Sequence, residues 1–125
     1  MTFNWREYLE LARAIQGQCG PGYSQEAADR TAISRAYYAA FGTVREYARR
    51  RLGYQPSRKS AEHGQLITYL GRRGAGPLAL AQTLSRLRLL RNQCDYDDAV
   101  PGLALQVIEV LELAEVILRG CMGAM

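Results

Sequence analysis

Apolar residues recur every three or four positions through most of this sequence, and that helical repeat limits the fold more than any other feature. The longest example lies between Ser24 and Leu52 and consists of Ile33, Tyr37, Ala40, Phe41, Val44 and Ala48. No stretch of the sequence sustains the alternation of apolar and polar residues that a half-buried β-strand needs. The repeat therefore predicts an all-α fold, in which amphipathic helices pack their apolar faces together as a bundle.

Residues that favour turns and helix caps divide the chain into five expected helices. These span residues 4 to about 16, 24–52, 62–72, 77 to about 98, and 103–118. Asn4 and Ser24 are the candidate N-caps of the first two, because short polar side chains accept hydrogen bonds from the free N–H groups of a first turn. Pro77 suits the first turn of the fourth helix, where its missing N–H leaves no bond unmade.

The composition bounds the class of protein. With 125 residues, 48% of them hydrophobic and 22% charged, we expect a single globular domain over residues 1–125. Charges interrupt the N-terminal stretch and no cleavage pattern follows it, so a signal peptide or membrane anchor is not expected. No apolar run approaches the roughly 20 residues needed to cross a bilayer. We therefore expect a soluble, cytoplasmic protein without a membrane partner.

The three cysteines, Cys19, Cys94 and Cys121, are odd in number and widely spaced. Their spacing favours neither a disulfide framework nor a zinc site. We expect reduced and mostly buried thiols, no metal site and no other cofactor.

The net charge of +4 is unevenly distributed. Basic residues gather in the middle third of the chain: Arg45, Arg49, Arg50, Arg51, Arg58, Lys59, Arg72 and Arg73. Such a cluster is either a solvated face or a surface for an anionic partner such as nucleic acid.

Arg91 interrupts an apolar stripe. At about 100° per residue, one face of the segment from Leu78 to Cys94 carries Leu80, Leu84, Leu87 and Cys94, with Arg91 among them. Burying an unpaired guanidinium costs several kcal/mol, so Arg91 must be paired or must face a groove. Asn92, Asp95 and Tyr96 follow closely and supply polar partners, which makes the end of this helix the place to expect a site.

Two segments together resemble a known family. SRAYYAAF at 34–41 and LRLLRNQCDYDD at 87–98 are similar to the paired motifs of HEPN domains, especially the small stand-alone prokaryotic proteins. The resemblance covers residues 24 to 118. It implies an antiparallel bundle of four to five helices that dimerises, and a role in toxin-antitoxin or defence systems. Many HEPN domains are metal-independent ribonucleases, and many are encoded beside a nucleotidyltransferase.

The resemblance implies a catalytic set of Arg91, Asn92 and Tyr96, but it is incomplete. HEPN ribonucleases carry a histidine a few residues after the arginine, whereas this window holds Tyr96, Asp97 and Asp98. The general acid or base that would act on a ribose 2′-hydroxyl is therefore missing from the motif. Tyr96 is either a helix-end phenol or a member of the site.

Three further residues, Asp95, Arg35 and His63, have two interpretations each. Asp95 forms either an intrahelical ion pair with Arg91 or part of a cleft. Arg35 either pairs with the Asp95–Asp98 turn or binds RNA or a nucleotide together with Tyr38. His63, the only histidine, is either a capping or packing residue or a spatial substitute for the missing catalytic histidine.

Two functions compete. In the first, the chain binds RNA or cleaves it weakly without metal at a dimer cleft lined by Arg91. In the second, it is a non-catalytic partner module that binds a nucleotidyltransferase or a nucleotide; a purely structural bundle would instead bury Arg91 in an ion pair. A homodimer is expected because Leu89, Leu90 and a wide apolar arc on the last helix exceed the needs of one core.

Overall fold

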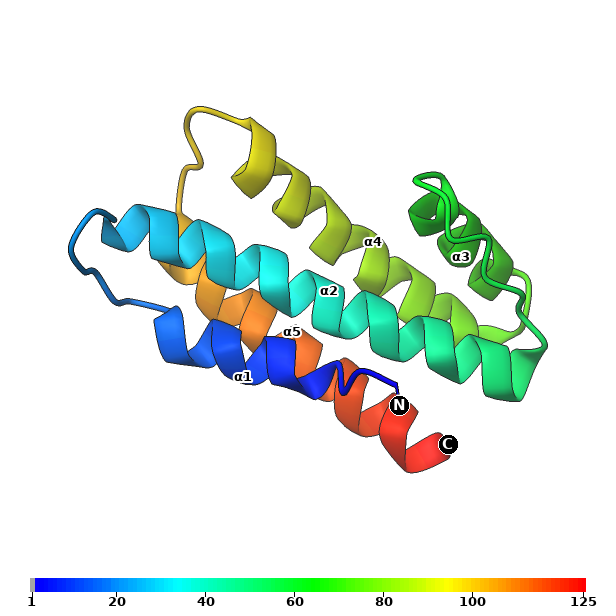
Figure 1. The fold of residues 1–125 in the computed structure, drawn as a ribbon. Helices are drawn as coiled ribbons and strands as arrows, with labels where there is room; N and C mark the ends of the chain where they lie inside the picture. The colour runs from blue at the N-terminus through cyan, green and yellow to red at the C-terminus, as the bar shows by residue number, and fades with distance from the viewer. Residues whose placement is uncertain (1) are drawn as a thin grey trace.

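The computed structural model describes residues 2–125 and contains only helices as regular elements within that range. The five helices are α1 (Arg6–Ile15), α2 (Gln25–Leu52), α3 (Glu62–Gly71), α4 (Ala75–Tyr96) and α5 (Leu103–Ala124) (Figure 1). The predicted all-α fold is confirmed. The expected helix number and order are also found.

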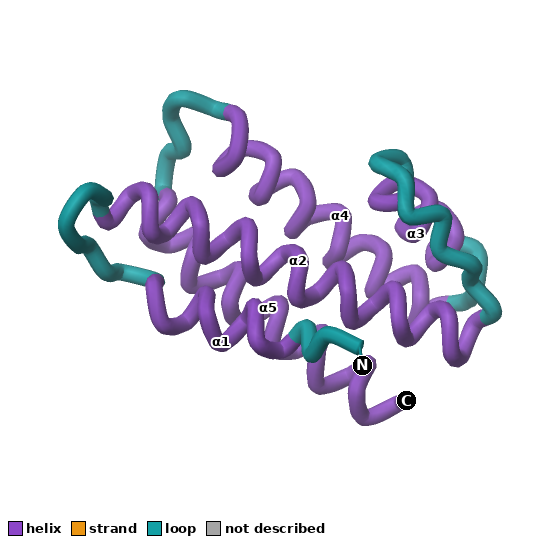
Figure 2. The backbone as a smooth tube through the Cα atoms, viewed as in Figure 1, coloured by secondary structure: helices purple, strands orange, loops and turns teal. Residues whose placement is uncertain are grey.

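The central element is α2, which packs against α1, α4 and α5, while α3 packs mainly on α4. Each long helix runs opposite to the long helix before it in the chain, so α2 and α4 are antiparallel as expected (Figure 1). The connections 16–24 and 97–102 lie at one end of the bundle, and the connection 53–61 lies at the other end beside α3 (Figure 2). This topology brings the start of α2 next to the end of α4.

The helix ends follow local capping chemistry. Ser24 is the N-cap of α2, and its Oγ accepts the N–H of Ala27 at 3.1 Å, as predicted. Asn4 lies just outside α1, which begins at Arg6, although Asn4 Oδ1 still accepts the Arg6 N–H at 3.1 Å. Gly53 closes α2 in the left-handed conformation (φ 71°) that glycine adopts without strain.

The last helix is longer than predicted, because it continues past Leu118 to Ala124. The buried positions along α5 end with Ile117, Leu118 and Cys121, so the packing stripe extends one turn beyond Leu118. Packing of that turn outweighs the low helix propensity of Gly120 and Gly123.

A close approach between α1 and α2 depends on Gly42. Gly42 is buried, and a Cβ added there would overlap the Trp5 ring. The indole is therefore seated directly on the α2 backbone. This contact fixes the orientation of Trp5 at the edge of the molecule.

Two features of the outer surface bear on partners. Leu90 packs in the core, contrary to the expectation that it adds to an outer apolar surface, whereas Leu89 is exposed. Four apolar side chains of α5 are also exposed: Leu105, Ile108, Val116 and Met122. Over residues 2–125, no helix combines the length and the hydropathy that crossing a bilayer requires.

Candidate functional site

Arg91 is buried in the apolar stripe of α4, with 7% of its surface exposed. Its Nη1 lies 3.3 Å from Asp95 Oδ2, so the predicted i, i+4 pair is present. The guanidinium also lies over the rings of Tyr37 and Tyr38, with its carbon 5.2 and 5.3 Å from their centroids. Its Nε–H is buried and has no acceptor within residues 2–125. One carboxylate contact thus leaves Arg91 short of hydrogen-bond partners.

Arg88 lies one turn before Arg91 and is in a similar position. Its Nε is also buried without an acceptor among the described residues. Its Nη1 lies next to Gly64 of α3, where an added Cβ would come to 3.5 Å from it. Two guanidinium groups from one helix therefore approach the junction with α3, and each retains an unused donor.

His63 lies at the start of α3, close enough to Arg91 and Arg88 for their charges to act on its ring. Its Nδ1 shares a hydrogen bond of 2.5 Å with the Tyr37 hydroxyl, and its ring stacks on Phe41 at a centroid distance of 4.3 Å. Burial lowers the pKa of His63, and the positive charges of Arg91 and Arg88 lower it further. The imidazole is therefore mainly neutral at pH 7.

Tyr37 links α2 to α3 through its hydrogen bond to His63. Burial raises its pKa above the usual value, so the phenol keeps its proton at neutral pH. The hydrogen bond to His63 thus joins two uncharged groups. We call the set Tyr37, Tyr38, His63, Arg88 and Arg91 the Arg91 cluster.

The structure shows where His63 lies relative to the two motif segments. His63, which lies outside the motif segments, contacts Tyr37 and lies within the electrostatic reach of Arg91. Arg88 belongs to the same cluster, although the sequence interpretation left it out. Its only sequence signal was a second arginine one turn before Arg91.

Arg35 does not pair with the Asp95–Asp98 turn in the described structure. Arg30 does so instead, donating to the carbonyl oxygens of Cys94, Asp97 and Asp98 at 3.1, 2.6 and 3.0 Å. The antiparallel crossing sets this choice, because Arg30 lies one turn nearer the start of α2. Arg35 stacks on Tyr38 and lines a pocket together with Asp95.

Two predicted site residues make none of the contacts that define the Arg91 cluster. Tyr96 is 76% exposed at the end of α4, and Asn92 is half-buried. Within residues 2–125 neither side chain makes a hydrogen bond. Both residues follow Arg91 on α4, but the other members of the cluster come from α2, from α3 and from the preceding turn of α4.

His63 opens onto a basic pocket. This pocket of about 380 Å³ is lined by Trp5, Tyr38, Phe41, Arg45, Arg58, Lys59, Glu62 and His63. A neighbouring pocket of about 550 Å³ is lined by Thr2, Phe3, Trp5, Arg45, Glu46, Arg49, Arg50, Pro56 and Arg58. Because three residues line both, the pockets form one continuous depression, which we call the basic groove. The structure thus gathers most of the basic residues of the middle third beside His63.

Glu62 organises the wall of this groove. Its carboxylate is 2% exposed and accepts from the Tyr54 hydroxyl at 3.1 Å and from the Arg58 N–H at 3.2 Å. Arg45 adds an ion pair at 3.4 Å. Burial, together with the Glu62 charge, raises the pKa of Tyr54 to about 12. These contacts hold the connection 53–61 against α2 and α3.

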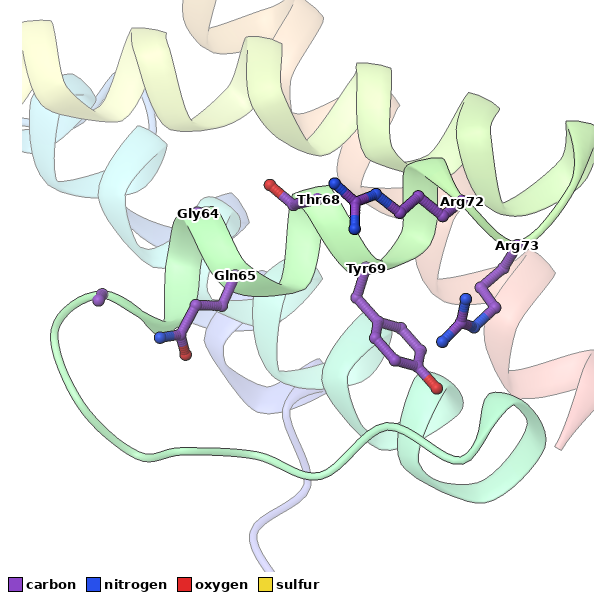
Figure 3. Close-up of a pocket in the computed structure, with 7 residues that line it drawn as sticks. Gly64, Gln65, Thr68, Tyr69, Arg72 and Arg73 are labelled. Atoms are coloured by element: carbon purple, nitrogen blue, oxygen red, sulfur yellow. The ribbon is translucent and has the colours of Figure 1, made fainter.

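The outer face of α3 carries a separate basic pocket. It is lined by Ala61, Gly64, Gln65, Thr68, Tyr69, Arg72 and Arg73, none of which lines the basic groove (Figure 3). Arg73 stacks on Tyr69 at 3.9 Å, and the Tyr69 hydroxyl donates to the Leu52 carbonyl at 2.6 Å. Arg72 and Arg73 therefore have the same charge as the groove residues but a different location.

Within residues 2–125 no three His, Cys, Asp or Glu side chains lie close enough together to hold a metal ion. Comparisons of the chain with protein-family models, with curated proteins and with solved structures find no match.

Proposed function

We propose that this chain is a HEPN-like module of a prokaryotic toxin-antitoxin or defence system, and that its Arg91 cluster cleaves RNA without metal. The observation that carries this proposal is the neutral imidazole of His63 near Arg91 and Arg88, whose Nε–H groups are buried and have no acceptor among the described residues. A histidine and an arginine are the two groups that such a ribonuclease needs. Here the histidine comes from α3 rather than from the motif on α4.

The chemistry assigns a role to each group. The neutral imidazole of His63 takes the proton of a ribose 2′-hydroxyl, and the oxygen attacks the adjacent phosphorus. A bond from O2′ to phosphorus forms, the bond to O5′ breaks, and the leaving O5′ takes up a proton from solvent water. The products are a 2′,3′-cyclic phosphate and a 5′-hydroxyl. Arg91 and Arg88 stabilise the charge that develops on the phosphate oxygens.

The Asp95 contact is compatible with this role. A single oxygen at 3.3 Å uses only one of the five N–H donors of Arg91. A phosphate offers several acceptors, and guanidinium groups bind such oxygens in pairs. The Nη donors of Arg91 that Asp95 leaves unused are therefore the ones available to phosphate oxygens, because its Nε–H is buried.

A second function is favoured by the burial of Arg91. An arginine that is 7% exposed and ion-paired also suits a module whose arginine only stabilises the fold. Such a module would bind a nucleotidyltransferase or a nucleotide and would not cleave RNA. The two functions differ in whether Arg91 is needed for any RNA cleavage.

The deciding experiment is cleavage of labelled single-stranded RNA in EDTA. We expect weak cleavage that ends in cyclic phosphate. Arg91→Ala and His63→Gln should each lower the rate by at least about a hundredfold, the typical size of a charge-stabilising or acid-base contribution. Because the neutral form of His63 is the base and its pKa is lowered, the rate should fall only as the pH drops below about 6.5.

Arg86→Ala is the matched control, because Arg86 lies on the same helix but pairs with Glu109 on the surface. Its rate should equal that of the unchanged protein. Cleavage that survives Arg91→Ala would place the site elsewhere. Absence of cleavage from every RNA tested would favour the partner module.

We further propose that the protein is a homodimer and acts with a cognate nucleotidyltransferase. The exposed apolar side chains of α5 support the first part. The motif resemblance supports the second.

A further inference from the structure

The basic groove contains cations that the protein itself leaves unpaired. Five cations and two carboxylates line it, and each carboxylate is already engaged. Glu46 pairs with Arg49 and Arg50 at 2.6 and 2.7 Å. Arg58 and Lys59 have no carboxylate within 4.0 Å in the part of the chain that the structure describes. These two side chains are therefore available to phosphate oxygens.

The backbone of Arg58 is strained. Its φ of 59° is left-handed, a conformation that a non-glycine residue rarely adopts. The buried Glu62 holds it there by accepting the Arg58 N–H at 3.2 Å. A strained residue that a buried carboxylate fixes in place is typical of a binding segment.

Aromatic faces alternate with these charges along the groove. Phe3 is 47% exposed and lies 5.0 Å from Trp5, edge to face. The Arg45 guanidinium carbon lies 5.6 Å from the Trp5 centroid. Gly42 fixes the indole, so Trp5 meets a ligand without losing further rotamer freedom. Unstacked bases pack on such rings, whereas the bases of a duplex are hidden inside it.

From these contacts we infer that the basic groove binds single-stranded RNA, with bases on Phe3 and Trp5 and phosphates on Arg58 and Lys59. The groove ends at His63, so a bound strand is led to the Arg91 cluster. The ligand class rests on the proposed function, while the location rests on the groove alone. Binding in this groove needs only one copy of the chain.

The test uses Trp5, which is the only tryptophan of the chain. A short 2′-O-methyl oligoribonucleotide, which lacks the attacking hydroxyl, is titrated into the whole protein at several salt concentrations. We expect quenching of Trp5 fluorescence and an affinity that falls linearly with salt on a double-logarithmic plot. The double variant Arg58→Gln, Lys59→Gln should bind about tenfold more weakly and should lower the magnitude of the salt slope by about 1.4, the value for two phosphate contacts on a single strand.

The double variant Arg72→Gln, Arg73→Gln is the matched control. It removes the same charge from the outer face of α3, which is not part of the groove, and should bind within about twofold of the unchanged protein. Circular dichroism melts confirm that both double variants fold. Phe3→Ala, which removes an exposed ring at the groove edge, should weaken binding by about tenfold, the value of one stacked base.

Three outcomes overturn the inference. These are equal losses in both double variants, tighter binding of a duplex of the same length, and binding with no change in Trp5 fluorescence. This binding test is independent of the proposed cleavage, because the 2′-O-methyl strand reports binding alone. If Arg91→Ala abolishes cleavage while the groove variants bind as the unchanged protein does, only the groove assignment is wrong. If the groove binds and no RNA is cut, only the catalytic proposal is wrong.

Discussion

At the scale of the residue, Gly42 has a role that its neighbours cannot share. It lies in the middle of α2, where glycine lowers helix stability by about 1 kcal/mol relative to alanine. Here the missing Cβ makes room for the Trp5 ring. The position therefore exchanges helix propensity for a tertiary contact that shapes the basic groove.

We predict that Gly42→Ala destabilises the protein, because the new Cβ overlaps the indole and forces it off its seat. Overpacking of this kind costs about 1–3 kcal/mol. Urea denaturation should measure that loss, and the emission of the only tryptophan should shift toward that of a solvated indole. Gly120→Ala is the control, since no atom lies within 4 Å of its added Cβ. It should leave stability unchanged or raise it, and equal behaviour of the two variants would show that the Trp5 contact is unimportant.

At the scale of the element, α1 depends on its neighbours. A helix of 10 residues is too short to be stable by itself. Leu9 and Ala12 bury its apolar face, and Glu115 of α5 accepts from Arg6 at 2.6 Å and from Arg13 at 2.9 Å. These ion pairs fasten both ends of α1 to α5.

We predict that Glu115→Gln lowers the free energy of unfolding by about 1 kcal/mol at low salt, the upper value for surface ion pairs. Hydrogen bonds from Arg6 lower the pKa of Glu115 to about 2, below the usual 4.5. Its stabilising effect is therefore complete above about pH 4.5 and is lost as the pH falls toward about 2. Denaturation at several pH values should show the variant and the unchanged protein converging in acid. Glu112→Gln, whose carboxylate makes no ion pair in residues 2–125, should match the unchanged protein throughout.

At the scale of the whole molecule, the bundle divides its surface by chemistry. The end of α2 and the connection 53–61 carry the cations of the basic groove, of which Arg58 and Lys59 are unpaired, whereas α5 presents exposed apolar side chains. The proposed RNA site and the proposed dimer surface therefore occupy different elements.

We predict a dimer that depends on α5. Sedimentation equilibrium at micromolar concentration should give the dimer mass for the unchanged protein and the monomer mass for Val116→Glu, which places a charge at a side chain that is 68% exposed. Tyr96→Glu changes a residue that is 76% exposed at the end of α4 and should remain dimeric. A monomer at every concentration contradicts the dimer. Dissociation by Tyr96→Glu instead of Val116→Glu would place the interface on α4.

The helical elements follow from local chemistry alone. The spacing of Ile33, Tyr37 and Val44 predicts α2, and Ser24 begins that helix because its hydroxyl satisfies a free N–H. The place of Arg91 in the apolar stripe of α4 also follows from the spacing, which leaves open whether the side chain is paired or faces a groove. These features depend on residues within a few turns of one another, so a linear sequence contains the information that fixes them.

The site depends on which helices meet, and that is decided by packing over the whole chain. The proximity of His63 to Arg91 links α3 to α4, and the contact of Trp5 with Gly42 links the residue before α1 to α2. Neither pair is close in the sequence, so local chemistry does not predict them. The same packing gives the Asp95–Asp98 turn to Arg30 instead of Arg35, since the antiparallel crossing determines which turn of α2 faces it. The sequence by itself thus determines the helices and the position of Arg91 in an apolar stripe. Only the tertiary structure decides which histidine, ring and cations surround it, because distant segments acquire a common environment only when they pack.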